Sequence, residues 1–196
     1  LGLSSRNSGF LLLFLLGCVA RLVSAWYLGR IYEPPYRPRP ADRFTLLDFV
    51  RRAPRAHFGR FVFYCTLMHV GIGGLNPFVG WYVMDQLDKP AHLFATVATV
   101  QFAMSFASQP LWGRLIDKIG SKRVLTIAGL GLMLTPALMA AATNVPTLLV
   151  AQAYDGLLIG AFQIAMQNYM MEAVTPPKRA RCAAFHSLFL SVAQAI

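Results

Sequence analysis

Residues 113–123 read GRLIDKIGSKR, a short charged stretch that separates two long apolar ones. The apolar stretches cover about 91–112 and 123–142, so each is close to the roughly 20 residues that a helix needs to cross the hydrocarbon core of a bilayer. Neither stretch alternates apolar and polar residues as a barrel strand does. The pattern therefore predicts two membrane helices joined by a tight polar turn.

The same pattern continues on both sides of this pair. Further apolar stretches cover 9–32, 59–84 and 146–171, and another begins near 183. Apolar residues make up 56% of the chain and charged residues 13%, against roughly 25% charged residues in an ordinary soluble domain. The sequence therefore predicts an all-α, polytopic membrane bundle with about six transmembrane helices, the last of them truncated. Because the chain starts at Leu1 and stops inside an apolar run, we expect it to be a segment of a longer protein.

Basic residues are concentrated in every second connection between the apolar stretches. The connection at 33–60 contains seven arginines, 113–123 contains four basic residues and 172–182 contains three, whereas 85–90 has one lysine and 142–146 has none. This is the positive-inside pattern, which places the three basic connections in the cytoplasm. The pattern explains the net charge of +10 without a nucleic-acid partner, and it predicts a multi-pass protein of the plasma (inner) membrane.

The connection at 33–58 is the longest polar part of the chain. Four prolines between positions 34 and 40 exclude a helix there. A short amphipathic helix is predicted from Arg43 to Arg52, with Asp42 as its N-cap. The apolar residues near one face of this helix are Phe44, Leu47 and Val50. Such a face favours a helix that lies on the inner membrane surface, and the alternative is a mobile basic linker.

The stretch at 113–123 resembles the cytoplasmic signature loop of the major facilitator superfamily, G-x-L-x-D-[RK]-x-G-[RK]-[RK]. The residues that match are Gly113, Leu115, Asp117, Lys118, Gly120 and Lys122. Ser121 stands where the family usually has a basic residue. The resemblance implies that Asp117 and Lys118 belong to a charge network that latches the inner gate between two halves of a transporter. The alternative is a simple basic turn that sets the topology, in which Gly120 allows the chain to reverse.

The resemblance also implies which part of a transporter this is, since family members have two six-helix halves joined by a long cytoplasmic loop. Residues 1–32 would form the last helix of the first half, 33–58 the cytoplasmic interdomain loop with its short helix, and 59–196 an incomplete second half. A second, weaker resemblance to the family lies in the loop after the fifth apolar stretch, where residues 172–179 read EAVTPPKR.

Polar residues inside the apolar stretches are the candidates for a solute pathway, because polar groups in hydrocarbon face the bundle interior or a watery cavity. In the fifth stretch they recur at three- and four-residue steps on one face, as Gln152, Gly156, Gly160, Gln163 and Gln167. This face either lines a cavity or packs against other helices. For packing, Gly156 and Gly160 form a small-xxx-small pair.

Asp155 flanks this face and is the one acid well inside an apolar stretch. An ionised Asp at the centre of a membrane helix costs about 3 kcal/mol, so this carboxylate must be paired, protonated or in contact with water. Two roles stay open for Asp155, a link to solute or protons and a structural partnership with another helix. If it carries protons, Asp155→Asn is expected to abolish pH-dependent uptake.

The second apolar stretch is interrupted by Gly73, Gly74, Asn76 and Pro77. Pro77 leaves a backbone carbonyl without its helical partner and allows the helix to kink. The segment is therefore a candidate hinge, and Asn76 is a candidate contact for the solute.

Secondary transport of a small solute by alternating access is the function that these features favour, with proton coupling as an open option. The sequence contains no Walker loop, zinc-binding helix or nucleophile elbow, so neither enzyme activity nor a cofactor is expected. The expected partners are the solute and membrane lipids, and the full-length protein is expected to be a monomer. Two rivals remain: a lipid-modifying enzyme, which would need clustered acids or histidines at a membrane face, and a transporter-like protein with an assembly or sensor role.

Overall fold

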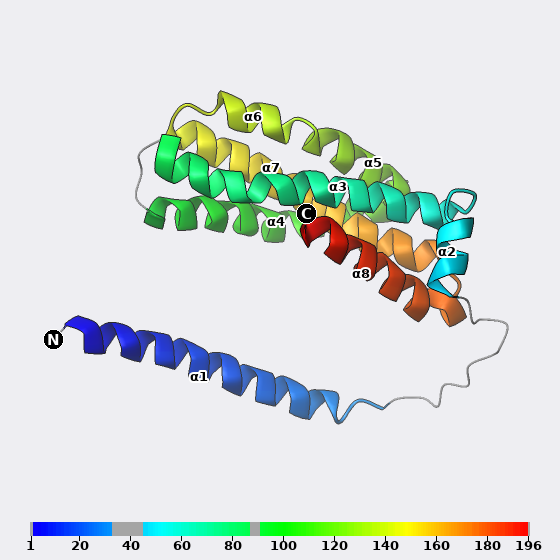
Figure 1. Ribbon diagram of the computed structural model, residues 1–196, viewed down its shortest axis with the longest axis horizontal. Helices are drawn as coiled ribbons and strands as arrows, with labels where there is room; N and C mark the ends of the chain where they lie inside the picture. The colour runs from blue at the N-terminus through cyan, green and yellow to red at the C-terminus, as the bar shows by residue number, and fades with distance from the viewer. Residues whose placement is uncertain (1, 33–44, 87–90, 196) are drawn as a thin grey trace. The chain divides into compact units, whose positions relative to one another are not determined.

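The computed structural model describes residues 2–32, 45–86 and 91–195, and all the regular elements there are helices (Figure 1). The all-α class predicted from the sequence is therefore confirmed. The chain divides into two compact units, residues 1–39 and 40–196.

The first unit contains helix α1, Gly2–Leu28. Its large apolar side chains, among them Phe14 and Leu22, are exposed within the unit. Near its C-terminal end the Arg30 guanidinium lies 3.8 Å from the centre of the Trp26 ring, a cation–π contact that holds the chain beyond the helix against its last turn. The exposed surface of α1 therefore needs lipid or another protein surface to cover it.

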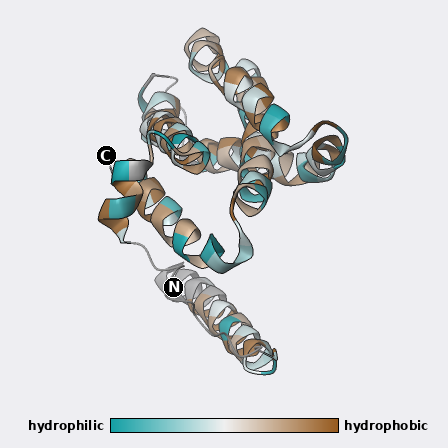
Figure 2. Ribbon diagram, turned by 90° about the vertical axis from the view of Figure 1, so that its right-hand side faces the viewer, coloured by the Kyte–Doolittle hydropathy of each residue, from teal (hydrophilic) through white to brown (hydrophobic). Residues whose placement is uncertain are grey.

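The second unit is a bundle of helices arranged around α7. Its elements are α2 (Leu46–Arg52), α3 (His57–Trp81) with the π-helical turn η2 (Tyr82–Gln86), α4 (Ala91–Ile119), α5 (Ser121–Leu132), α6 (Thr135–Ala141), α7 (Val145–Ala173), the 3-10 turn η3 (Pro176–Lys178) and α8 (Arg179–Ala195). Most turns of these helices are apolar or weakly polar (Figure 2). Helices thus cover each apolar stretch that the sequence identified.

Three helical segments of the described residues are long and apolar enough to cross a membrane, at 57–85, 121–141 and 145–173. α1 contains a shorter apolar stretch, Phe14–Leu28. α4 has the length, 29 residues, but its middle is interrupted by polar side chains. These are Gln101, Ser105, Ser108 and Gln109. α4 therefore depends on its neighbours to shelter its polar groups from lipid.

Helices α4 and α7 pack with their backbones in contact. A methyl group at Gly156 would overlap the backbone of Gln101, and one at Gly160 would lie 2.6 Å from the carbonyl oxygen of Ser105. Across the same seam, Trp112 Nε1 donates a hydrogen bond of 2.9 Å to a carbonyl oxygen of α7. Membrane helices approach this closely only where small residues face each other. α4 and α7 therefore form one rigid pair.

The stretch predicted as a membrane helix at 123–142 is confirmed as a segment able to cross a membrane, and it contains a short break between α5 and α6 that the sequence analysis did not predict. α5 ends at Leu132, and Pro136 near the start of α6 cannot donate a helical hydrogen bond. The carbonyl oxygen of Gly131, just before the break, accepts a hydrogen bond of 3.0 Å from the Tyr154 hydroxyl of α7. The break is thus stabilised from the neighbouring helix.

The charged stretch at 113–123 is helical on both sides of one residue, which corrects its description as a loop. α4 continues to Ile119 and α5 starts at Ser121, so the chain reverses at Gly120. The φ angle of Gly120 is 89°, in the left-handed region that glycine adopts without strain. The charged residues before Gly120 therefore extend α4 by about two turns beyond its apolar part.

The short helix α2 starts at Leu46, later than predicted. Its N-cap is Thr45, whose hydroxyl oxygen accepts from the N–H of Asp48, while the Asp48 carboxylate accepts from the N–H of Thr45, each at 3.2 Å. This capping box corrects the prediction of Asp42 as the N-cap. Residues 42–44, where the predicted helix began, lie outside the described residues.

Phe49 is the side chain that docks α2 on the bundle. It is buried, with its ring 5.4 Å from Phe185 and 6.2 Å from Phe189 of α8, measured between ring centres. Leu47 and Val50, the described members of the predicted apolar face, are exposed. α2 therefore has two apolar faces, one on the protein and one open.

Candidate functional site

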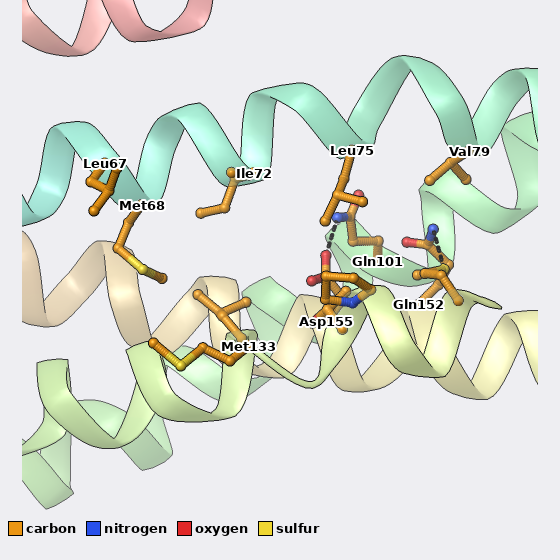
Figure 3. Close-up of a pocket in the computed structure, with 14 residues that line it drawn as sticks. Leu67, Met68, Ile72, Leu75, Val79, Gln101, Met133, Gln152 and Asp155 are labelled. Carbon is orange, nitrogen blue, oxygen red and sulfur yellow. Dashed lines mark hydrogen bonds between the residues drawn. The ribbon is translucent and has the colours of Figure 1, made fainter. Parts of the chain in front are cut away.

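A cavity of about 240 Å³ lies between α3, the α5–α6 break and α7 (Figure 3). The apolar side chains that α3 directs into it include Leu67, Met68, Ile72, Leu75 and Val79. The polar residues that line it are Gln101, Thr135, Gln152 and Asp155. We call it the α3–α7 cavity. Mainly apolar walls with a few polar groups are the usual form of a small-molecule site.

Asp155 is held by a side chain from α4. Its Oδ2 accepts a hydrogen bond of 2.6 Å from Gln101 Nε2, and only 7% of the residue is exposed (Figure 3). Thr135 at the start of α6 lies buried beside the same carboxyl group. A buried carboxylate is tolerated inside a membrane bundle when a hydrogen-bond donor such as the Gln101 amide binds it. The sequence analysis identified Asp155 but not its partner, although Gln101 is one of the polar residues inside the apolar stretch 91–112.

Gln152 is one turn before Asp155 on α7 and is 3% exposed. Its Nε2 lies 3.8 Å from the sulfur of Met139, a weak contact. Its Oε1 is buried and has no hydrogen-bond partner among the described residues. An unpartnered buried acceptor costs about 1–3 kcal/mol, so this oxygen is suited to accept a hydrogen bond from a molecule that enters the cavity.

A second cavity, of about 380 Å³, lies on the α8 side of the bundle. We call it the α3–α8 cavity. Its polar lining residues are His69, Gln101, Ser105, Gln109, Gln163 and Gln194. Gln101 borders both cavities, so one amide joins the two polar regions of the bundle.

The structure divides the residues that the sequence grouped on one face of the fifth stretch. Gln152 and Asp155 line the α3–α7 cavity, Gln163 lines the α3–α8 cavity, and Gln167 is exposed. Gly156 and Gly160 lie in the seam with α4. The face therefore contains lining residues and packing residues side by side.

The candidate hinge residues lie inside α3, which continues without interruption to Trp81. Gly73 approaches the backbone of α8 at Ala193, 3.9 Å from where its Cβ would be, whereas Gly74 has no neighbour within 4 Å. Pro77 is exposed within the helix. The side chain of Asn76 lies outside the described residues, so its role as a solute contact stays a prediction.

The signature residues gather where α4 meets α5. Gly113 faces Ile164 of α7, and Leu115 is half-buried against the core. The charged members Asp117, Lys118 and Lys122 are exposed. The exposed charges are therefore available to a surface outside the described bundle.

Ser121, the residue that departs from the family signature, is buried. It binds Glu172 in the second stretch that resembles the family, residues 172–179. Its hydroxyl donates a hydrogen bond of 2.5 Å to Glu172 Oε2 at the end of α7. In the same region Arg179 caps α7, with Nε donating to the carbonyl oxygen of Val174 at 3.1 Å and Nη2 to that of Met171 at 2.9 Å. The sequence marked these residues as motif members but gave no signal that the two motifs touch.

A family model described as Major Facilitator Superfamily matches residues 56–196. This chain belongs to the major facilitator superfamily. The match covers all of the bundle from α3 onward, including both cavities and both motifs. The family resemblance drawn from residues 113–123 is thereby confirmed, and the major facilitator fold is a multi-pass membrane bundle.

Three relatives of this major facilitator protein indicate the range of similar proteins. A "Major facilitator superfamily multidrug transporter mfsB" of Aspergillus fumigatus is 36% identical over 89 residues, 45% of this chain and 15% of that protein. A "Multidrug resistance protein MdtG" of Proteus mirabilis is 31% identical over 122 residues, 60% of this chain and 30% of that protein. The protein of the same name from Escherichia coli is 32% identical over 126 residues, 62% of this chain and 29% of its own length.

The chain therefore spans less than a third of the length of these relatives. No solved structure matches it. Membership of the superfamily points to a transporter rather than an enzyme.

Proposed function

We propose that this chain forms part of a secondary transporter that moves a small solute across the membrane by alternating access. In this mechanism two half-bundles rock about a central site, and binding of the solute shifts the populations of inward- and outward-open states. The observation that carries the proposal is the group formed by buried Asp155 and Gln152 with half-buried Gln101 at the wall of a mainly apolar cavity. Such polar groups are costly in a membrane bundle unless they serve a pathway or a partner.

The lining of the α3–α7 cavity supports a mainly apolar organic solute that carries at least one hydrogen-bond donor. Met68, Met133 and Met139 lie among its walls, and methionine side chains adapt to ligands of different shape. The free Oε1 of Gln152 would accept from the donor of the solute, and Asp155 would supply charge. One relative is named as a multidrug transporter and another as a multidrug resistance protein, and both names agree with a site of this kind.

Asp155 is the proposed proton-linked group of this half of the protein. Its carboxyl group lies beside the cavity and is bound by one amide donor, so gain or loss of a proton would change the charge inside the membrane. Coupling that change to solute binding would let a proton gradient drive transport. The runner-up role, a purely structural bond between α4 and α7, uses the same Gln101 contact.

The exposed charges at the α4–α5 turn are the proposed inner latch. Asp117 and Lys118 extend beyond the apolar part of α4 into the cytoplasm, where the opposite half-bundle would meet them. We place the protein in the plasma (inner) membrane as a monomer, with the basic connections inside.

Solute counterflow in vesicles that contain the full-length protein tests the function. Labelled organic cations, organic anions and neutral drugs are loaded in turn, and exchange is followed with and without a pH gradient. Exchange of any one solute supports transport. A failure of every class to exchange, combined with turnover of a membrane lipid, would instead support the rival enzyme.

The Asp155→Asn variant separates the two roles of the carboxyl group. If Asp155 is proton-linked, exchange continues but its response to the pH gradient is lost. Asp85→Asn is the matched control, since Asp85 is exposed in η2 and lines neither cavity. Unchanged pH dependence in Asp155→Asn would leave Asp155 with the structural role alone.

A further inference from the structure

The cytoplasmic end of the bundle contains a third hollow that transport does not explain. This groove, of about 440 Å³, runs between α2 and the first turns of α3. The residues that line it include Phe49, Val50, Val62, Phe63, Thr66 and Phe189. Nearly all of its surface is apolar, and Arg60 is the charged residue in its lining. We call it the α2–α3 groove.

The groove lies beside the N-terminal end of a helical segment that is long and apolar enough to cross a membrane. The apolar segment 57–85 starts within α3, so Arg60 belongs to its first turn. Thr66 follows six residues later, about 9 Å deeper along the helix axis. A molecule in the groove would therefore have one end among charged side chains at the interface and the other beside hydrocarbon.

The outer wall of the groove faces away from the helices of the second unit. Phe63 is 71% exposed and Val50 is exposed as well. Exposed aromatic and aliphatic surface at membrane depth is stable against acyl chains and unstable against water. The occupant of the groove is thus expected to bring a hydrocarbon chain.

The arginines around the groove indicate which chemical group the other end of the bound molecule carries. Arg51, Arg55 and Arg60 are all exposed around the α2–α3 turn. Arg60 is oriented by a hydrogen bond of 3.2 Å from its Nε to the carbonyl oxygen of Pro54, and its two terminal nitrogens carry further N–H donors that could bind a phosphate. Arginine forks suit phosphate oxygens, and each basic residue near an anionic membrane surface contributes about 1 kcal/mol.

We propose that the α2–α3 groove binds one anionic phospholipid of the inner leaflet, with its phosphate at Arg55 and Arg60 and an acyl chain along Phe63 and Thr66. The segment 33–44 has three arginines against two acids, Glu33 and Asp42, which leaves a net charge of +1, so the basic rim does not attract it as it attracts a phosphate. Bound lipid would fasten the interdomain helix to the membrane-spanning bundle. The proposal concerns binding alone and does not depend on which solute is carried.

The test uses the full-length protein in nanodiscs of phosphatidylcholine that contain a minor fraction of phosphatidylglycerol with a diazirine on its acyl chain. Light should attach this lipid to peptides that contain residues 49–54 and 62–66. A phosphatidylcholine bearing the same diazirine should label them more weakly by roughly 10- to 30-fold, the preference expected from two arginines. Equal labelling by the two lipids, or labelling only elsewhere, would overturn the proposal.

Two variants test which property of Arg55 and Arg60 causes the preference for phosphatidylglycerol. Arg55→Gln/Arg60→Gln should lose the preference for phosphatidylglycerol, while Arg55→Lys/Arg60→Lys should keep most of it because the charge remains. Arg123→Gln/Lys178→Gln removes the same charge from the other basic connections and should have no effect.

Thr66→Trp tests the acyl end without touching a charge. The larger side chain should fill the groove and abolish labelling by both lipids at these peptides. Retention of labelling in Thr66→Trp, or retention of the headgroup preference in Arg55→Gln/Arg60→Gln, would mean that the lipid binds outside the groove and would refute the assignment.

Discussion

The two sides of α7 are built in opposite ways. Toward α4, glycines bring the backbones together, and no methyl group fits at Gly156. Toward α3 and the α5–α6 break, side chains stand apart around a cavity of about 240 Å³. Gln101 belongs to both sides, since its backbone forms the tight seam and its amide reaches the cavity to bind Asp155. The close packing of α4 against α7 therefore positions the Gln101 amide, which binds Asp155 at the wall of the α3–α7 cavity.

The largest expected effect comes from breaking the seam with Gly156→Ala. The added methyl group overlaps the backbone of Gln101, which cannot move away without separating the two helices. We expect a loss of about 2–3 kcal/mol in stability, seen as a lower midpoint of thermal unfolding in detergent micelles.

Gly74→Ala is the matched control for this substitution. Gly74 lies in α3 with nothing within 4 Å of the position of its Cβ. Alanine favours a helix over glycine by up to about 1 kcal/mol, so this variant should be as stable as the parent or more stable. If Gly156→Ala is as stable as Gly74→Ala, the seam is looser than the structure describes.

A smaller effect is expected from Gln101→Met, which keeps the length of the side chain and removes the donor to Asp155. The carboxylate then loses its bond while it stays buried, at a cost of about 1–3 kcal/mol. The cost falls on the ionised form, so the difference in unfolding midpoint between variant and parent should be largest at mildly alkaline pH and shrink as pH falls.

Gln109→Met controls for loss of an amide from the same helix. Gln109 lines the α3–α8 cavity and does not bind Asp155. Its substitution should therefore shift the unfolding midpoint by the same amount at every pH. A pH-independent loss in Gln101→Met would show that the bond to Asp155 does not hold an ionised group.

The positions of the helices could be predicted from the sequence because the length and apolarity of a membrane helix are set by the bilayer, whatever its neighbours. The reversal at Gly120 was also predictable, since it depends on a local backbone conformation. The residue at which α4 ends could not be predicted in this way. Arg114, Asp117 and Lys118 are as polar as a loop would be, and polarity does not distinguish a loop from a helix that leaves the membrane and continues into water.

The contents of the site were only partly predictable. Asp155 and Gln152 stood out because polar residues are rare in apolar stretches. Their surroundings depend on contacts between distant parts of the chain: the Gln101 partner is 54 residues away, and the Ser121–Glu172 bond spans 51. The burial of Phe49 likewise depends on its contacts with Phe185 and Phe189 of α8, which the sequence of α2 alone does not predict.

The smallest of these effects concerns the C-terminal end of α7, where one hydrogen bond joins α7 to α5. The Ser121 hydroxyl donates to Glu172, so the start of α5 is joined to the end of the rigid α4–α7 pair. We expect a double-mutant cycle of Ser121→Ala and Glu172→Ala to give a coupling of about 1 kcal/mol in unfolding, the usual contribution of one such hydrogen bond.

The double-mutant cycle also tests whether α5 moves together with the rigid α4–α7 pair. If α5 moves with α4 and α7 as one body, each single variant should weaken the protection of the backbone amides of residues 121–124 from hydrogen exchange. The double variant should then lose no more protection than either single variant. If the coupling is zero and the two losses of protection add, Ser121 and Glu172 act separately. The signature turn would then move independently of α7, and any latch at Asp117 and Lys118 would have to reach the cavity through α4 alone.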